Sequence, residues 1–168
     1  YAHMNEITIA QLGNLGEFVG AIAVIASLIY VAAQIKQNTN ATRIATGQAH
    51  VDIWNDIASN LCTSSELASV WHQGLKGVST LDDGAKVQFF AQLGLIFRYY
   101  ESSYIEWQEG ALDDRLWEGL RSTLSDQLSH RGSLEWWQHR RHWFYDDFQV
   151  MVDDVIADGG GRSMYAEE

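Results

Sequence analysis

The chain has 168 residues and carries 22 acidic and 11 basic side chains, which gives a formal net charge of -11 at pH 7. This length predicts one domain plus one anchor, and the negative charge repels phosphate, which excludes nucleic acid as a partner. Prolines are absent, and apolar residues recur at helical spacing rather than in strand-like alternation. We therefore expect an all-α fold in which a long N-terminal apolar helix, interpreted as transmembrane, continues into a small bundle of about five helices.

The most apolar segment is an uncharged run from Phe18 to Ile35, FVGAIAVIASLIYVAAQI. As a helix it is about long enough to cross a hydrocarbon core roughly 30 Å thick. The segment lacks the basic start and the small-residue cleavage site of a secretory signal peptide. We interpret it as part of an N-terminal membrane-anchor helix over residues 4–40. The alternative is a fully buried helix at the centre of a soluble oligomer.

The charges that flank this run predict its orientation. No Lys or Arg precedes it, whereas Lys36 and Arg43 follow it. Because cytoplasmic flanks carry the basic excess, we expect a single-pass protein of the inner (cytoplasmic) membrane with its C-terminal domain in the cytoplasm.

Small residues lie on one face of the same helix, at Gly16, Gly20, Ala23 and Ser27. Small faces let helix backbones approach closely inside lipid. The pattern predicts a homo-oligomer that associates through the N-terminal helix, with membrane lipid as a further partner. A lipid-facing coincidence is the alternative.

The remaining boundaries follow from composition. Residues 1–3 are interpreted as a cloning remainder, because a His-Met pair is what a common cloning site leaves ahead of Met4. Residues 41–157 are expected to form the helical domain, and residues 158–168 a disordered tail, since GGGRSMYAEE is glycine-rich and polar. The single cysteine, Cys62, permits no internal disulfide and is interpreted as a buried small apolar residue.

Beyond the anchor, a stripe from Gly47 to Leu61 extends the same helix, and cap residues mark the others. The expected N-terminal caps are Thr63 with Glu66, Thr80 with Asp83, Asp113, Ser133, and Asp146 or Asp147, and the expected ends are Gly77, Gly110 and Ile156. His50 lies on the apolar stripe and His72 beside Trp71, so both are interpreted as hydrogen-bonded core histidines. No paired Glu-x-x-His segments and no HExxH pattern occur, so we expect no metal and no cofactor.

The densest polar cluster is the HRRH turn, which comprises His139, Arg140, Arg141 and His142. Trp136 and Trp137 precede the two arginines by four residues, a spacing that suits stacking of guanidinium on indole. Such a cluster could hold a phosphate, a lipid headgroup or a carboxylate-bearing partner. The alternative is that the arginines pair with the chain's own acidic residues.

A second cluster, RYYESSY, places Arg98, Tyr100, Glu101 and Tyr104 within about two helical turns. Glu101 could act there as a general acid or base, or an arginine could hold it in a structural ion pair. Arg98 is one candidate partner. We expect Arg140 or Arg141 to form a partly buried pair with Glu101, because a packed charge needs an opposite charge.

The segments QIKQNTNATR, ELASVWHQGL, ALDDRLWEGLRS and WWQHRRHWF resemble a group of uncharacterised bacterial proteins that have one N-terminal apolar helix and a Trp-rich helical remainder. The resemblance covers about Gly16 to Ile156 and implies a fold but no activity. We predict a membrane-anchored helical interaction or regulatory module, oligomeric and without catalytic activity, with an unidentified protein as a further partner. The alternative is a small lipid- or amphiphile-binding protein or enzyme with an aromatic pocket near Tyr100, Glu101 and the HRRH turn. A pore is a third possibility, although no charged residue lies in the apolar run to line one.

Overall fold

The computed structural model describes residues 9–163, and this part of the chain contains α-helices and two short 3-10 helices but no strands. In chain order these are α1 (Ile9–Thr63), α2 (Ser65–Lys76), η1 (Val78–Thr80), α3 (Asp83–Gln108), α4 (Asp114–Leu128), α5 (Arg131–Arg140), η2 (Arg141–Trp143) and α6 (Asp146–Asp158). The all-α prediction, with one long apolar N-terminal helix and a helical bundle, is confirmed. The chain divides into two compact units, Tyr1–Thr42 and Arg43–Glu168.

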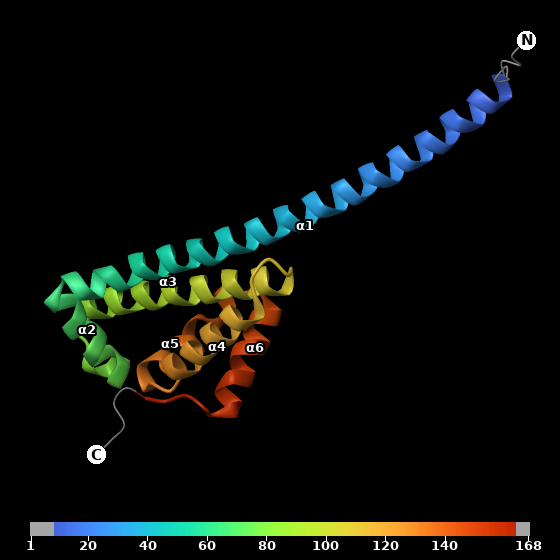
Figure 1. The fold of residues 1–168 in the computed structure, drawn as a ribbon. Helices are drawn as coiled ribbons and strands as arrows, with labels where there is room; N and C mark the ends of the chain where they lie inside the picture. The colour runs from blue at the N-terminus through green and yellow to red at the C-terminus, as the bar shows by residue number, and fades with distance from the viewer. Residues whose placement is uncertain (1–8, 164–168) are drawn as a thin grey trace, which may run out of the picture. The chain divides into compact units, whose positions relative to one another are not determined.

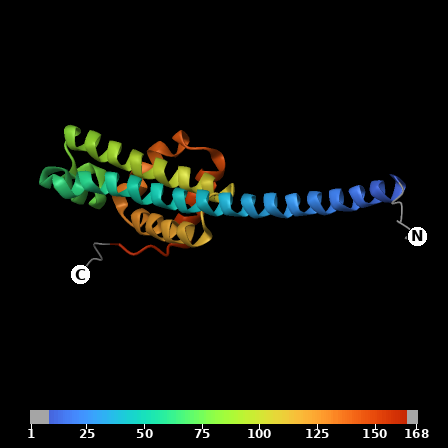
Figure 2. The ribbon, with the colours of Figure 1, turned by 45° about the horizontal axis from the view of Figure 1, so that its top comes forward.

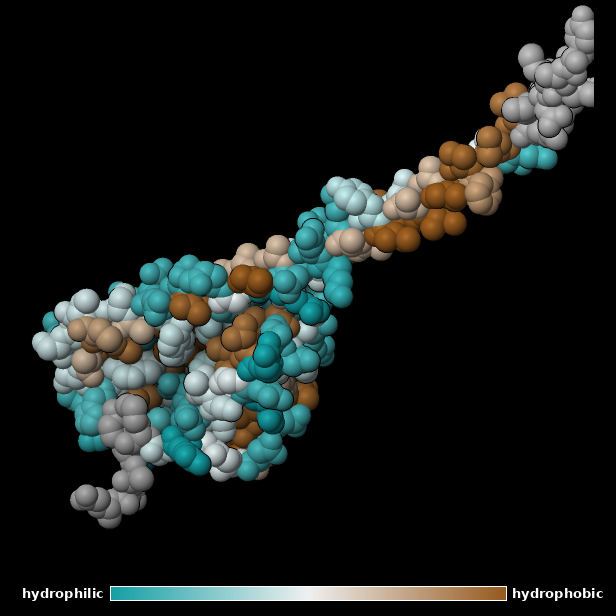
Figure 3. Space-filling model, in the orientation of Figure 1, coloured by the Kyte–Doolittle hydropathy of each residue, from teal (hydrophilic) through white to brown (hydrophobic). Residues whose placement is uncertain are grey.

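The N-terminal unit consists of the first part of α1, which runs without interruption through the apolar segment. The large side chains of this segment are exposed, and they form a brown, hydrophobic surface in Figure 3. Its few polar side chains bond within the helix, as Ser27 Oγ does to the Ala23 carbonyl at 2.8 Å and Gln34 Nε2 to Tyr30 Oη at 3.1 Å. The apolar segment therefore presents little unsatisfied polar surface. Residues 1–3 lie outside the described residues.

The C-terminal unit is organised around α3, which lies alongside the second half of α1 in both ribbon views (Figures 1 and 2). Two of the hydrogen bonds between these helices define their relative direction: Gln92 donates to the Ile57 carbonyl at 3.2 Å, and Tyr99 Oη donates to the His50 carbonyl at 3.5 Å. The earlier residue of α1, His50, bonds to the later residue of α3, Tyr99, and the later residue Ile57 bonds to the earlier residue Gln92. The two helices are therefore antiparallel.

Aromatic rings form the centre of this unit. Phe97 of α3 has no exposed surface, and its ring lies 4.9 Å from that of Trp136 and 5.3 Å from that of Trp137, both on α5. Phe144 and Phe148 close the cluster from the C-terminal segment, with ring centroids 5.6 Å apart. These aromatic side chains are packed against one another, and they form the hydrophobic core of the unit.

Helices α2 and α5 touch through glycine. A Cβ added at Gly132 would lie 1.7 Å from the carbonyl oxygen of Gly74, and one added at Gly74 would lie 2.4 Å from the ring of Phe89. No side chain fits between two backbones at that separation. The close approach of α2 and α5 therefore depends on the missing Cβ of Gly132, and the approach of α2 to Phe89 of α3 depends on the missing Cβ of Gly74.

The structure confirms some predicted caps and shifts others by one or two residues. Asp113 caps α4 by accepting the Arg115 N–H at 3.1 Å, and Gly110 follows α3 with a φ of 72°. The α2 cap is Ser64, not Thr63, and the α3 cap is Asp82, not Thr80. Neighbouring residues of similar capping ability make these alternatives hard to separate by sequence.

Helix α5 begins at Arg131, and its N-cap is His130, three residues before the predicted cap. Ser133 is buried instead, and its hydroxyl accepts from Gln127 Nε2 at 2.6 Å. Helix α6 begins at Asp146, but its cap residue is Tyr145 and no side chain bonds to its first turn. The sequence therefore predicted where these two helices lie, but it predicted the wrong N-terminal cap residue for each.

One expectation about local packing is wrong. Cys62 is exposed, because it lies at the last turn of α1 on the side away from the core. Two described residues of the tail contact α4: the Arg162 N–H donates to Asp126 Oδ1 at 2.6 Å, and Gly161 lies against the Ser125 carbonyl. Glycine permits this contact, since a Cβ there would lie 2.0 Å from that oxygen. Residues 164–168 lie outside the described part of the chain.

Candidate functional site

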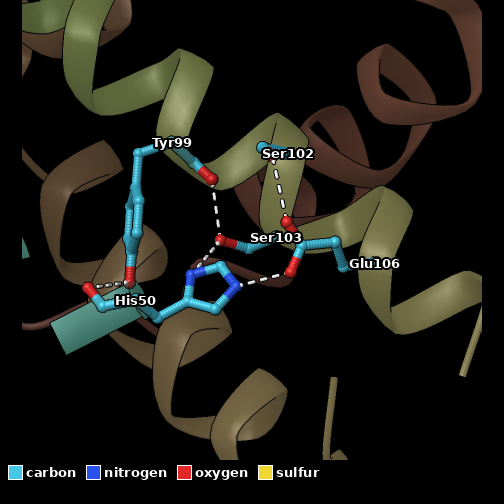
Figure 4. Close-up of polar contacts among 5 residues, drawn as sticks. All are labelled: His50, Tyr99, Ser102, Ser103 and Glu106. Carbon is cyan, nitrogen blue, oxygen red and sulfur yellow. Dashed lines mark hydrogen bonds and ion pairs between the residues drawn. The ribbon is translucent and has the colours of Figure 1, made fainter. Parts of the chain in front are cut away.

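A partly buried polar cluster joins α1 to α3 (Figure 4). His50 of α1 lies between two side chains of α3, with Nε2 2.8 Å from Glu106 Oε2 and Nδ1 3.3 Å from Ser103 Oγ. Ser103 Oγ also donates to the Tyr99 carbonyl at 2.7 Å, and Ser102 Oγ donates to Glu106 Oε1 at 3.3 Å. The α3 members recur at helical spacing, so one face of α3 supplies them all. The prediction that His50 is a hydrogen-bonded core histidine is confirmed.

This cluster contains the residue types of a Ser-His-carboxylate triad, but Ser103 is not accessible. Its side chain has no exposed surface, and its hydroxyl lies against the carbonyl one turn earlier in its own helix. A nucleophile must reach a substrate carbonyl, and an oxyanion needs free donors near it. The arrangement instead satisfies the polar groups of a helix-helix contact, which would cost free energy if left unpaired.

Two tyrosines beside this cluster are held in their protonated form. Burial raises the pKa of Tyr100 to about 12, against a hydrogen bond to Thr123 that lowers it. Burial likewise raises the pKa of Tyr99. Both phenols act as hydrogen-bond donors, Tyr100 to Thr123 Oγ1 at 3.1 Å and Tyr99 to the His50 carbonyl.

A cavity of about 410 Å³ opens next to His50, between α1 and α4. We call it the α1–α4 groove; it is lined by Gly47, His50, Val51, Trp54, Tyr99, Leu112, Arg115, Leu116, Gly119, Leu120 and Thr123. Val51, Trp54 and Leu116 are 50%, 38% and 45% exposed, so the groove is open to solvent. Ligand sites in proteins have volumes of about 300–1,000 Å³ and mostly apolar walls. A second cavity, of about 270 Å³, shares Trp54 and Thr123 with it.

The structure does not bring the predicted pocket residues together. Tyr100 is buried and lines the second cavity, whereas Tyr104 lines a different one with Trp107 and Trp117. Glu101 accepts from Arg98 Nη1 at 2.5 Å and from the Tyr145 N–H at 3.1 Å. Arg98 in turn donates to the Trp143 carbonyl at 2.9 Å. Glu101 and Arg98 thus hold α3 to the segment that follows α5.

The predicted ion pair between Glu101 and Arg140 or Arg141 is wrong, because Arg98 occupies that carboxylate. Arg141 pairs with Asp153 at 2.6 Å, and both side chains are nearly half exposed. Arg140 lies over the rings of Trp143 and Phe90, 4.9 and 5.4 Å from their centroids.

The stacking predicted for the HRRH turn is also wrong in its partners. Trp136 and Trp137 are 0% and 2% exposed, so their faces are already covered in the core. In addition, α5 ends at Arg140, so Arg141 lies beyond the helical register that the spacing assumed. His139 and His142 are exposed. The turn is a largely solvated surface.

The other sequence candidates are placed as follows. Gly16, Gly20, Ala23 and Ser27 lie on the exposed apolar part of α1, with open space where a Cβ would stand at Gly16 and Gly20. His72 is half-buried. Within residues 9–163 no group of three or more His, Cys, Asp or Glu side chains is arranged to hold a metal ion.

The chain matches no protein-family model, and no curated protein and no solved structure is detectably similar to it. Its function must be inferred from its own residues.

Sequence reasoning missed the partners of His50 and the groove beside it. The spacing of Tyr99, Ser103 and Glu106 was visible as a polar stripe within RYYESSYIEWQE, but no local signal paired it with α1. Gly119 was a second visible signal, because glycine is unfavourable inside a predicted helix. The structure shows that no neighbouring atom requires a glycine at this position.

Proposed function

We propose that this chain is a membrane-anchored helical interaction or regulatory module, oligomeric through its N-terminal helix, with its C-terminal domain in the cytoplasm. The observation that carries the proposal is the exposed apolar part of α1. The 18-residue window there has a mean hydropathy of 2.2, and none of it is buried. An uncovered apolar surface of this length is costly in water and favourable in a bilayer.

The C-terminal unit supports the choice of a module over an enzyme. Its aromatic rings are packed into the core, and Ser103 cannot meet a substrate. The charged residues of the HRRH turn and Glu101 contact the chain itself rather than a common cavity.

Two arginines placed in the apolar run test the anchor. Each arginine at the centre of a membrane helix opposes insertion by about 2.5–3.5 kcal/mol on translocon scales. The doubly substituted Ile25→Arg, Leu28→Arg chain should therefore leave the membrane pellet after alkaline extraction, whereas the wild-type chain should require detergent. The doubly substituted Ile44→Arg, Val87→Arg chain is the control, because it adds the same charge at two exposed residues outside the run. A wild-type chain that is soluble without detergent would instead support a buried helix in a soluble assembly.

A reporter fused after Ser163 should be active inside the cell if the orientation is as proposed.

Substitution of Gly20 by Leu tests the oligomer. The larger side chain should block close approach of two helices along the small face, so the mass of the complex in mild detergent should fall towards that of one chain. Ala32→Leu is the matched control, because it also introduces a leucine in place of a small residue, but on the opposite face of the helix. An oligomer that survives Gly20→Leu associates through another surface.

A further inference from the structure

We infer that a hollow beside the C-terminal end of α3 binds a small quaternary ammonium compound of the choline type, whose cationic head contacts aromatic rings and lies near two aspartates. The hollow has a volume of about 490 Å³ and lies between α3, α4 and α6. We call it the α3–α6 hollow; the residues that line it include Tyr104, Trp107, Trp117, Arg121, Asp147 and Asp154. The inference adds a ligand to the proposed module and does not depend on its membrane anchorage.

Aromatic rings form part of the lining of the hollow. Trp107 and Trp117 are stacked, with ring centroids 5.4 Å apart, and the Tyr104 ring lies 5.9 and 5.3 Å from them. A hydrogen bond from Trp107 Nε1 to Asp114 Oδ1 at 2.9 Å fixes the Trp107 ring. Tyr104 and Trp107 are only half-buried, so part of each ring is open to a ligand. Aromatic rings attract cations to their faces, and tryptophan does so most strongly.

The charged side chains of the hollow leave an excess of negative charge. Asp147 and Asp154 of α6 are exposed, and within residues 9–163 neither forms an ion pair. Arg121 also lines the hollow, but its guanidinium is bonded to Asp158 at 2.9 Å. The two free carboxylates act on the aromatic lining: burial raises the pKa of Tyr104, and the charges of Asp147 and Asp154 raise it further. The hollow therefore favours a cation.

The lining selects a large, weakly hydrated cation. A metal ion needs several oxygen, nitrogen or sulfur ligands at short range, and no group of three or more His, Cys, Asp or Glu side chains in the described part of the chain is arranged to hold one. A primary ammonium is strongly hydrated and would lose that water on reaching the rings. A quaternary ammonium has no N–H groups to leave unbonded, so it can contact the rings at little cost. The exposed carboxylates attract it through space and keep their own water.

Choline binding to the full chain tests the inference. The chain is purified in dodecyl maltoside, a detergent without a choline group, and binding is measured by isothermal titration calorimetry. The control ligand is neohexanol, the uncharged alcohol in which a carbon atom replaces the nitrogen of choline. We expect choline to bind about tenfold more tightly than neohexanol, because only choline gains the cation–π contact. Equal binding of the two ligands, or no binding of choline at millimolar concentration, would overturn the inference.

Variants of the lining locate the bound choline. Trp107→Leu should weaken binding about tenfold through loss of a cation–π contact, whereas Trp143→Leu, at an exposed tryptophan outside the hollow, should leave it unchanged. Asp154→Asn should weaken binding about threefold, the effect of one unit charge a few ångströms away in water. Asp146→Asn is its matched control, because it removes an exposed carboxylate of the same helix that does not line the hollow. Asp154 is exposed, so its variant tests the site even if Trp107→Leu loosens the fold. Choline binding that Trp107→Leu and Asp154→Asn both leave unchanged would overturn the site.

The same cationic group occurs on phosphatidylcholine, and a competition experiment separates the two sources. Phosphatidylcholine added to the micelles should not displace choline from the wild-type chain if the ligand is a soluble compound. Displacement would overturn the soluble ligand and assign the hollow to a lipid headgroup. A chain that requires detergent for extraction but binds no choline would overturn this inference and leave the proposed anchor intact.

Discussion

Gly132→Ala is expected to destabilise the C-terminal unit by about 3 kcal/mol or more, the upper range for overpacking a well-packed contact. The added methyl group would lie 1.7 Å from the Gly74 carbonyl oxygen, and the obstacle is backbone rather than a movable side chain. Helices α2 and α5 must therefore separate, which also loosens the aromatic rings that α5 supplies to the core. Because domains are stable by only about 5–15 kcal/mol, the loss is a large fraction of the total.

Denaturation of the full chain in mild detergent, followed by tryptophan fluorescence, measures this effect. All seven tryptophans follow Arg43, so the signal reports on the C-terminal unit alone. Gly119→Ala is the matched control: it is also a glycine inside a helix, but with open space before it. It should stabilise the helix by about 1 kcal/mol. Equal responses of the two variants would show that α2 and α5 are not in backbone contact.

Phe97→Ala is expected to cost about 3–5 kcal/mol, as for large-to-small changes of buried aromatics. The Phe97 ring is fully buried and touches rings from both α5 and the segment after it. Its removal leaves a cavity among rigid rings that cannot collapse easily. Phe97→Leu should cost less, because it retains most of the apolar volume.

The same fluorescence measurement applies, with Leu95→Ala as the control. Leu95 lies two residues away on α3 and is 53% exposed, so its truncation should change stability by no more than about 0.5 kcal/mol. A loss below about 1 kcal/mol for Phe97→Ala would contradict a tightly packed core at this position. The aromatic cluster would then be a candidate ligand cavity, as the alternative reading of the sequence supposed.

Much of the fold could be predicted because its signals are local. The absence of proline and the stripe from Gly47 to Leu61 correctly indicated that the N-terminal apolar helix continues without a break, and Gly110 marked the end of α3. The errors at Thr63 and Thr80 are choices between cap residues that lie one and two positions apart, at Ser64 and Asp82. Cys62 shows the same limit, because its apolar neighbour did not indicate which face of α1 it occupies.

The candidate site was harder to predict. His50 was recognised as a bonded core histidine, but Ser103 and Glu106 as its partners were not, since they lie more than fifty residues further along the chain. Glu101 illustrates the opposite error. Both Arg98 and the HRRH arginines were acceptable partners by composition, and the nearer one, on the same helix, holds the carboxylate.

The sequence by itself determined the helical class, the apolar segment and its flanking charges, because these depend on periodicity and composition over one stretch of chain. Tertiary structure decided which charged residues pair, which aromatics are covered, and where a groove is left open between α1 and α4. Those outcomes depend on the register between helices that are distant in sequence, and a shift of one residue rotates a side chain by about 100° around its helix. Helical periodicity fixes the face on which a residue lies, but only the packing of that face against another helix fixes what the residue meets.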